Sequence, residues 1–117
     1  MKLIKSKFHG ILDYAAVILL LIAPALFGLT PFVSAITYTL AGIHLLLTIL
    51  TDFPYGIIKV IPYKIHGLVE FIVSLVLIAL PWIFKFDGDA IDRQFYLGFG
   101  GFVFLLWLLT DYQHKKV

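Results

Sequence analysis

The sequence predicts an all-α fold, a four-transmembrane-helix bundle made of two tandem parallel helical hairpins. Three observations lead to this prediction. The 117 residues are 62% hydrophobic and 14% charged, with a mean hydropathy of +1.03, which argues against a soluble domain with a single core. Four long windows are almost free of charge, and the first half of the chain resembles the second. The whole chain, 1–117, is therefore expected to be one transmembrane domain.

The apolar windows account for most of the chain and give the four predicted helices in order. They cover residues 11–29, 32–50, 68–84 and 94–109. With its flanks, each is long enough to cross a hydrocarbon layer of about 30 Å. Little sequence remains for a soluble domain, so the predicted function lies in or at the membrane.

An internal repeat defines the two hairpins. The segment Lys7-Phe8-His9-Gly10-Ile11-Leu12-Asp13-Tyr14 returns 57 residues later as Lys64-Ile65-His66-Gly67-Leu68-Val69-Glu70-Phe71. Thr51-Asp52-Phe53 returns 59 residues later as Thr110-Asp111-Tyr112. Repeat 1 spans about 7–53 and repeat 2 about 64–112. Because each contains two spans, the repeats share one orientation and are related by a pseudo-two-fold axis along the membrane normal.

The basic residues predict the orientation. They gather at the N-terminus, in the central connection and at the C-terminus: Lys2, Lys5, Lys7, Lys59, Lys64, Lys115 and Lys116. The opposite side has only Lys85 and Arg93, beside Asp87, Asp89 and Asp92. Since Lys and Arg favour the cytoplasmic side, both termini are expected there, in a bacterial cytoplasmic membrane. The connection, about 54–63, is expected to lie at the interface, with Lys59 reaching lipid headgroups.

The repeated unit resembles a known family. A helix ending in Leu80-Pro81-Trp82, then a short loop and a second helix, with the whole unit present twice, resembles the small bacterial and archaeal membrane proteins named for a Ser-Pro-Trp (SPW) repeat. The chain departs from that motif, because leucine replaces its serine and the first copy is Ala23-Pro24-Ala25. The resemblance implies the tandem-hairpin fold and no particular activity.

Six repeated polar residues form the candidate site. The histidines open the odd-numbered helices, a carboxylate follows each of them four residues later on the same helix face, and Thr-Asp ends the even-numbered helices. The candidate metal ligands are His9, Asp13, Asp52, His66, Glu70 and Asp111. Two histidines and four carboxylates at one membrane face are an adequate ligand set for one or two divalent cations.

Two other interpretations of this site stay open. The six residues can act as clamps between helices that satisfy one another and hold the hairpins in register. They can also handle protons or bind a small ligand, because ionisable residues in membranes are functional candidates by default.

A polar stripe on the second predicted helix suggests a rival function. Its members follow one another in steps of three or four residues: Thr30, Ser34, Thr37, Ala41, His44, Thr48 and Thr51. His44, near mid-membrane, is also a candidate cofactor ligand, although a haem would need a second histidine facing it. A proton- or ion-translocating protein using Thr37, His44, Thr48 and Thr51 is therefore the alternative. Otherwise the threonines bond their own helix and His44 donates once to a neighbour.

Other functional classes find no support in the sequence. The chain has no cysteine, which excludes disulfides and thiolate metal sites. It also has no phosphate-binding loop, no Ser/His/Asp set in a plausible catalytic order and no basic patch beyond the lysines of the predicted cytoplasmic side. We therefore predict a structural or ligand-binding protein more readily than an enzyme. Its expected partners are membrane lipids and a second copy of the chain, and nucleic acid is not expected.

Overall fold

The computed structural model describes residues 3–86 and 90–112 of the chain, and these residues form an all-helical architecture. The elements in order are α1 (Ser6–Phe27), α2 (Pro31–Leu50), β1 (Thr51–Asp52), β2 (Ile61–Pro62), α3 (Tyr63–Ile83) and α4 (Ala90–Leu109). Five charged residues that entered the orientation argument lie outside the described residues: Lys2, Asp87, Asp89, Lys115 and Lys116.

Three of the helices are long and apolar enough to cross a membrane: α1, α2 and α3. The fourth, α4, has 20 residues but is less apolar than the other three, because its first turns contain Asp92, Arg93 and Gln94. Aliphatic side chains stand exposed along the bundle, among them Ile18, Ile43, Ile72 and Leu105. Such a surface suits an acyl-chain environment.

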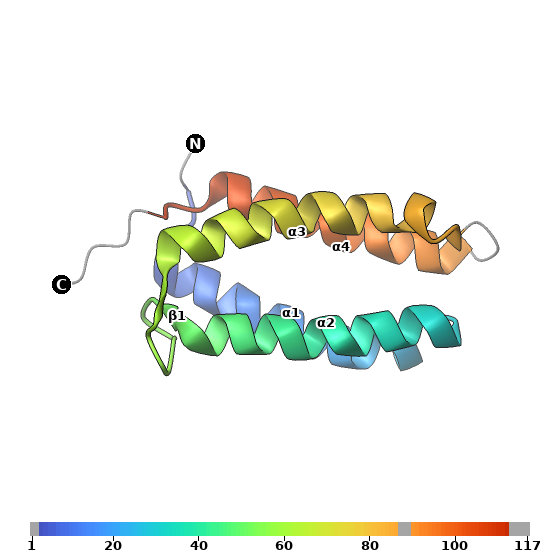
Figure 1. The fold of residues 1–117 in the computed structure, drawn as a ribbon, viewed down its shortest axis with the longest axis horizontal. Coiled ribbons are helices and arrows are strands. Elements are labelled where there is room, and N and C mark those ends of the chain that lie inside the picture. The colour runs from blue at the N-terminus through green and yellow to red at the C-terminus, as the bar shows by residue number, and fades with distance from the viewer. Residues whose placement is uncertain (1–2, 87–89, 113–117) are drawn as a thin grey trace.

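The helices are arranged as two antiparallel hairpins that lie side by side (Figure 1). In the first hairpin α1 packs against α2, and in the second α3 packs against α4. The turn of the first hairpin is short because Gly28 adopts a left-handed conformation, with φ of 64°, which ends α1, and Pro31 opens α2. The core between the helices is built from aliphatic and aromatic side chains such as Leu20, Val33, Leu77 and Tyr96.

Short extended segments join the two hairpins at the end where the connection lies. Strand β1 pairs with β2 in parallel, with Thr51 opposite Ile61. A parallel bridge also joins Ile4 to Thr110. Each hairpin therefore ends with a threonine that pairs with backbone just before a helix of the other hairpin.

The loop between β1 and β2 covers the end of α2. Backbone N–H groups of Ile57 and Ile58 donate to the Ile49 carbonyl, so the last turn of α2 is satisfied without a side-chain cap. The side chains of Ile57, Ile58 and Val60 are exposed on either side of exposed Lys59. This arrangement fits the interfacial segment that the sequence predicts for the connection.

At the opposite end of the bundle, a buried carboxylate joins the hairpins. Asp92 of α4 accepts the backbone N–H of Thr30 at 3.1 Å and the Thr30 hydroxyl at 2.6 Å. Thr30 is the N-cap of α2, so the carboxylate also lies at a helix N-terminus, where negative charge is favoured. The sequence places Asp92 only in a charged loop and does not predict this role.

We expect the Thr30→Val variant to unfold more easily, because it leaves a buried carboxylate without its hydroxyl partner. The loss should be about 1.5–3 kcal/mol, the usual contribution of a hydrogen bond to a charged group. Thermal unfolding in detergent measures it. The matched control is Thr39→Val, since the exposed Thr39 hydroxyl donates only to its own helix at Ala35, and its effect should stay within about 0.5 kcal/mol. Equal effects in both variants would contradict the assignment.

Candidate metal centre

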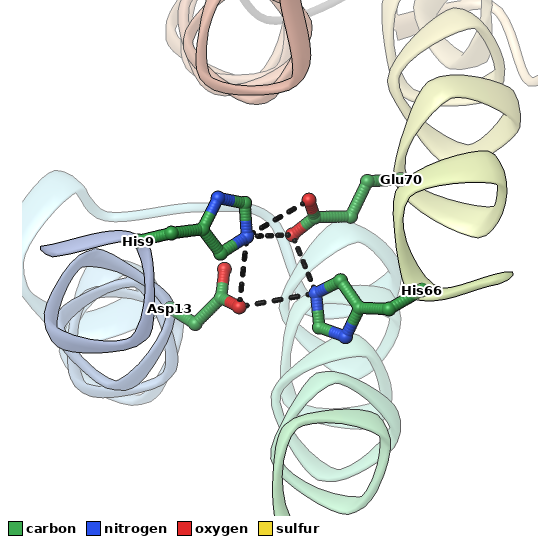
Figure 2. Close-up of side chains that lie close together, drawn as sticks. All are labelled: His9, Asp13, His66 and Glu70. Carbon is green, nitrogen blue, oxygen red and sulfur yellow. Dashed lines mark hydrogen bonds and ion pairs between the residues drawn. The ribbon is translucent and has the colours of Figure 1, made fainter. Parts of the chain in front are cut away.

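Four buried side chains come together between α1 and α3: His9 and Asp13 from α1, and His66 and Glu70 from α3 (Figure 2). We call them the His/carboxylate cluster. In each helix the two residues are four positions apart, so they project from the same face. Every member is at most 2% exposed, and one ligand atom from each lies within 4.8 Å of the other three.

The contacts run around a ring in which nitrogen and oxygen alternate. His9 Nε2 lies 3.1 Å from Asp13 Oδ2 and 3.0 Å from Glu70 Oε1. His66 Nε2 lies 3.1 Å from Asp13 Oδ2 and 3.1 Å from Glu70 Oε2. Each imidazole therefore faces both carboxylates, and each carboxylate faces both imidazoles (Figure 2).

Two threonines determine which ring nitrogens face the centre of the cluster. His66 Nδ1 lies 2.6 Å from Thr51 Oγ1, and that hydroxyl already donates to the Leu47 carbonyl. His9 Nδ1 lies 2.8 Å from Thr110 Oγ1. The Thr110 hydroxyl in turn donates to the Leu106 carbonyl.

Because a hydroxyl has one hydrogen, each of these threonine oxygens can only accept from the imidazole. Both histidines therefore carry their proton on Nδ1. In the neutral imidazole this leaves the Nε2 lone pair directed at the carboxylates, which is the arrangement of a metal-ligating histidine whose other nitrogen is held by an outer hydrogen bond.

The carboxylates have one further partner each. The Tyr112 hydroxyl donates to Glu70 Oε1 at 2.6 Å, and His44 Nε2 of α2 lies 3.5 Å from Asp13 Oδ1. Burial, together with the negative charge of Glu70, raises the pKa of Tyr112, so this hydroxyl keeps its hydrogen and acts as a donor. Among the described residues, both Asp13 carboxylate oxygens and His66 Nε2 have ion-pair neighbours but make no hydrogen bond of good geometry.

Three aromatic side chains, which we call the aromatic cap, cover the cluster on the side of the chain termini: Phe53, Tyr63 and Tyr112. The rings of Phe53 and Tyr63 stack at 5.5 Å, and those of Tyr63 and Tyr112 lie 4.9 Å apart. His9 meets Tyr63 and Tyr112 edge to face. The cap helps to exclude water from the charged groups.

Two glycines make room for the cap. A Cβ atom on Gly67 would lie 2.9 Å from Cδ1 of Tyr112, and one on Gly10 would lie 2.8 Å from Cε2 of Phe53. The glycine after each histidine of the repeat thus allows an aromatic ring to lie against the helix. For Tyr112 this position brings the hydroxyl to Glu70.

Gly67→Ala should displace the Tyr112 ring and break its hydrogen bond to Glu70. We expect a loss of about 1–3 kcal/mol in the free energy of unfolding, the usual cost of overpacking. Gly42→Ala is the control: it lies in α2 with nothing within 4 Å of the added Cβ, so it should be stabilising by about 0.5–1 kcal/mol. Chemical unfolding in detergent gives both values, and a stabilised Gly67→Ala protein would contradict the packing described.

The structure does not bring two of the six predicted ligands into the cluster. Asp52 and Asp111 are half-buried and lie outside the group of four whose ligand atoms come together. The physical reason is that α2 ends at Leu50 and the chain then becomes extended. Successive side chains of an extended chain point to opposite sides, so with Thr51 directed at His66 the next side chain turns away.

Most of the polar stripe on α2 satisfies the helix itself. The hydroxyls of Thr37, Thr48 and Thr51 each donate to the carbonyl four residues earlier. Thr37 also bonds the Tyr96 hydroxyl at 2.6 Å. His44 differs from them because it approaches the cluster through Asp13.

Sequence reasoning did not find Phe53, Tyr63 or Tyr112 as parts of the site. A signal was present for two of them, since an aromatic residue follows Thr-Asp in both repeats. In a chain with 16% aromatic residues, that signal is hard to separate from an interfacial aromatic belt.

Comparison with protein-family models, with curated proteins and with solved structures gives no match. The function of the cluster therefore has to be inferred from its own chemistry.

Proposed function

We propose that the protein is a four-span integral membrane protein whose His/carboxylate cluster binds one divalent transition-metal cation. The observation that carries this proposal is the pair of threonine contacts. Thr51 and Thr110 hold the Nδ1 protons of both histidines, so that both Nε2 atoms face two carboxylates. Nitrogen and oxygen donors converge in this way on a metal with imidazole and carboxylate ligands.

The size of the ring suits a cation. Three neighbouring donor pairs of the ring are 3.1 Å apart and the fourth, His9 Nε2 and Glu70 Oε2, is 3.3 Å apart, so a cation among these four atoms would lie roughly 2 Å from each of them. Zinc keeps roughly 2.0–2.2 Å from imidazole nitrogen and carboxylate oxygen. A cation at the centre of the cluster therefore reaches all four residues.

The competing interpretation is a clamp of two protonated histidines and two carboxylates. It explains the contacts less completely, because each protonated Nε2 has one hydrogen but two carboxylate neighbours at about 3 Å. Two hydrogens cannot satisfy four contacts, and the Asp13 oxygens meet the histidines as ion pairs without a hydrogen bond of good geometry. A cation satisfies the four donors together.

The charge of the cluster favours a divalent ion. With neutral imidazoles the two carboxylates carry two negative charges, which a divalent cation cancels, and a buried site should be close to neutral. Imidazole suits zinc and iron, and carboxylate suits manganese. We therefore propose that the bound ion is Zn²⁺, Fe²⁺ or Mn²⁺.

Paired contacts support the proposed tandem repeats. Thr51 of the first repeat serves His66 of the second, and Thr110 of the second serves His9 of the first. The backbone pairs Thr51–Ile61 and Thr110–Ile4 follow the same exchange. A pseudo-two-fold axis through the cluster accounts for both sets. The resemblance to the Ser-Pro-Trp repeat proteins stays a prediction.

The proposed membrane placement rests on the exposed residues. Four exposed lysines, Lys5, Lys7, Lys59 and Lys64, lie at the end of the bundle that holds the cluster. We therefore propose that this end faces the cytoplasm and contacts anionic lipid headgroups. The aliphatic faces of the helices, including the later turns of α4, would then contact acyl chains.

The proposal is tested by adding metal to protein purified in the presence of a chelator. We expect Zn²⁺, Fe²⁺ (under anaerobic conditions) or Mn²⁺ to bind at one ion per chain and to raise the unfolding free energy by about 2.7 kcal/mol at a hundred times the Kd. Elemental analysis and thermal unfolding give the two readings. A protein that binds none of these ions, yet is fully folded, leaves the clamp as the function of the cluster.

A second function, proton or ion translocation along α2, draws on one contact. His44 lies 3.5 Å from Asp13 Oδ1, so it links the stripe to the cluster. This function is tested by measuring the flux of protons or ions into vesicles that contain the purified protein. Equal flux with the wild-type chain, His44→Val and empty vesicles would remove this function.

A further inference from the structure

A cavity of about 70 Å³ lies in the bundle interior next to the His/carboxylate cluster. Glu70 of the cluster forms part of its wall, and so does His44. The rest of the wall is apolar, with Leu47 of α2 and Val69 and Val73 of α3 among the lining residues. The aromatic cap closes the cluster toward the chain termini, whereas this cavity extends from the cluster toward the middle of the bundle.

The cavity reaches the outer surface of the bundle between α2 and α3. Ile43 lines it and is itself 58% exposed, while Leu47, Val69 and Val73 are half-buried. Around this opening the surface is apolar, with exposed Leu46 and Ile72. In the proposed membrane placement the opening faces acyl chains, so a ligand would enter from the lipid.

At its inner end the cavity has a polar side, formed by His44 and Glu70, and the rest of its wall is apolar. His44 has an Nε2 atom without a hydrogen-bond partner among the described residues, and this atom lies 3.5 Å from Asp13 Oδ1. The corresponding position of the second repeat is Val103, which also lines the cavity. A ligand in the cavity therefore meets one imidazole and one edge of the cluster, with hydrocarbon on the other sides.

We propose that this cavity binds the end of a lipid-soluble alcohol or phenol. The hydroxyl group lies at His44 beside the metal centre, and the apolar part extends between α2 and α3 into the membrane. The volume equals that of about five to seven water molecules at 10–15 Å³ each, but an apolar wall holds water poorly. The cavity has room for the hydroxyl group and the first few carbons of such an alcohol or phenol. The inference rests on the proposed metal site for its inner end.

The experiment uses the full chain in detergent, loaded with Zn²⁺, and a diazirine-bearing octanol as the photoreactive probe. We expect the label on cavity residues such as Leu47, Val69 and Val73, with competition by 1-octanol but not by octane. Val73→Phe fills the cavity and should reduce this labelling at least tenfold. Val76→Phe is the matched control, because Val76 lies on the same helix, is exposed and does not line the cavity.

Further variants keep the test decisive. Leu47→Phe, with exposed Leu46→Phe as its control, replaces Val73→Phe where that variant folds poorly. His44→Val should weaken the labelling several-fold, since it removes the proposed hydroxyl partner. Label spread over the exposed helix faces and unchanged by the cavity variants would overturn the inference.

Metal content measured on the same samples separates the two proposals. Bound zinc with diffuse labelling removes the alcohol site and keeps the metal site. Cavity labelling that depends on Val73 and His44 in a chain that binds no metal removes the metal centre and keeps the cavity as an alcohol site.

Discussion

His66→Ala should abolish stoichiometric metal binding. His66 Nε2 contacts both carboxylates of the cluster, so its removal leaves the cation with one imidazole. Loss of an outer hydrogen bond to a ligand typically costs about 10–100-fold in affinity, and loss of the ligand itself should cost at least the upper value. Elemental analysis and the metal-dependent rise in unfolding temperature should both show the loss.

The matched control is His44→Ala. His44 is also a histidine near Asp13, but it lies outside the ring of four, and its removal should leave one ion per chain. His66→Gln separates the metal from the clamp, because a glutamine side chain can still donate hydrogen bonds to the carboxylates. Under the clamp, His66→Gln recovers much of the stability and added metal has no effect on any variant. That pattern would refute the metal centre.

The four members of the cluster could be predicted because local geometry determines their direction. A histidine and a carboxylate four residues apart share a helix face whatever the tertiary structure, and the repeat places two such pairs at one end of a bundle. The hairpin arrangement followed from the apolar windows and the short turn at Gly28 in the same way. For these features the sequence contains the controlling information.

The features that the sequence does not predict lie at the points where the helices end. The sequence predicts that Asp52 lies at the end of the second helix, and in the structure this end is a short strand in which Thr51 pairs with Ile61. As a result, Thr51 contacts His66 of the cluster, and Asp52 lies outside the cluster. The pairing of β1 with β2 joins segments that are distant in the sequence, and a local sequence pattern does not predict such a pairing.

The two repeats differ at the positions that complete the carboxylates. Asp13 has His44 as a neighbour, where the second repeat has Val103, and Glu70 has Tyr112, where the first repeat has Phe53. A purely structural clamp between two similar hairpins would not need this difference. Under the proposed function, the difference leaves the cluster covered by Tyr112 on one side and open to the cavity at His44 on the other.

Thr110→Val provides the strictest test of the tautomer argument, because it changes no proposed ligand. Valine has nearly the shape of threonine but cannot accept the Nδ1 proton of His9, so the imidazole loses the partner that directs its Nε2 at the carboxylates. We expect metal affinity to fall about 10–100-fold while the helices remain folded. Titration calorimetry measures the affinity, and nitrogen NMR of the histidine rings reports which nitrogen carries the proton.

Thr48→Val is the control for that variant. Like Thr110, Thr48 is buried and donates to the carbonyl four residues earlier, but it lies within α2 and does not contact an imidazole of the cluster. It should change metal affinity less than about threefold, well below the range expected when an outer partner of a ligand is lost. In the metal-free protein, His9 should carry its proton on Nδ1 in the wild type and in Thr48→Val, and should show a mixture of tautomers in Thr110→Val. If Thr110→Val binds metal as tightly as Thr48→Val, then Thr110 does not orient His9, and the threonine contacts no longer support a metal centre.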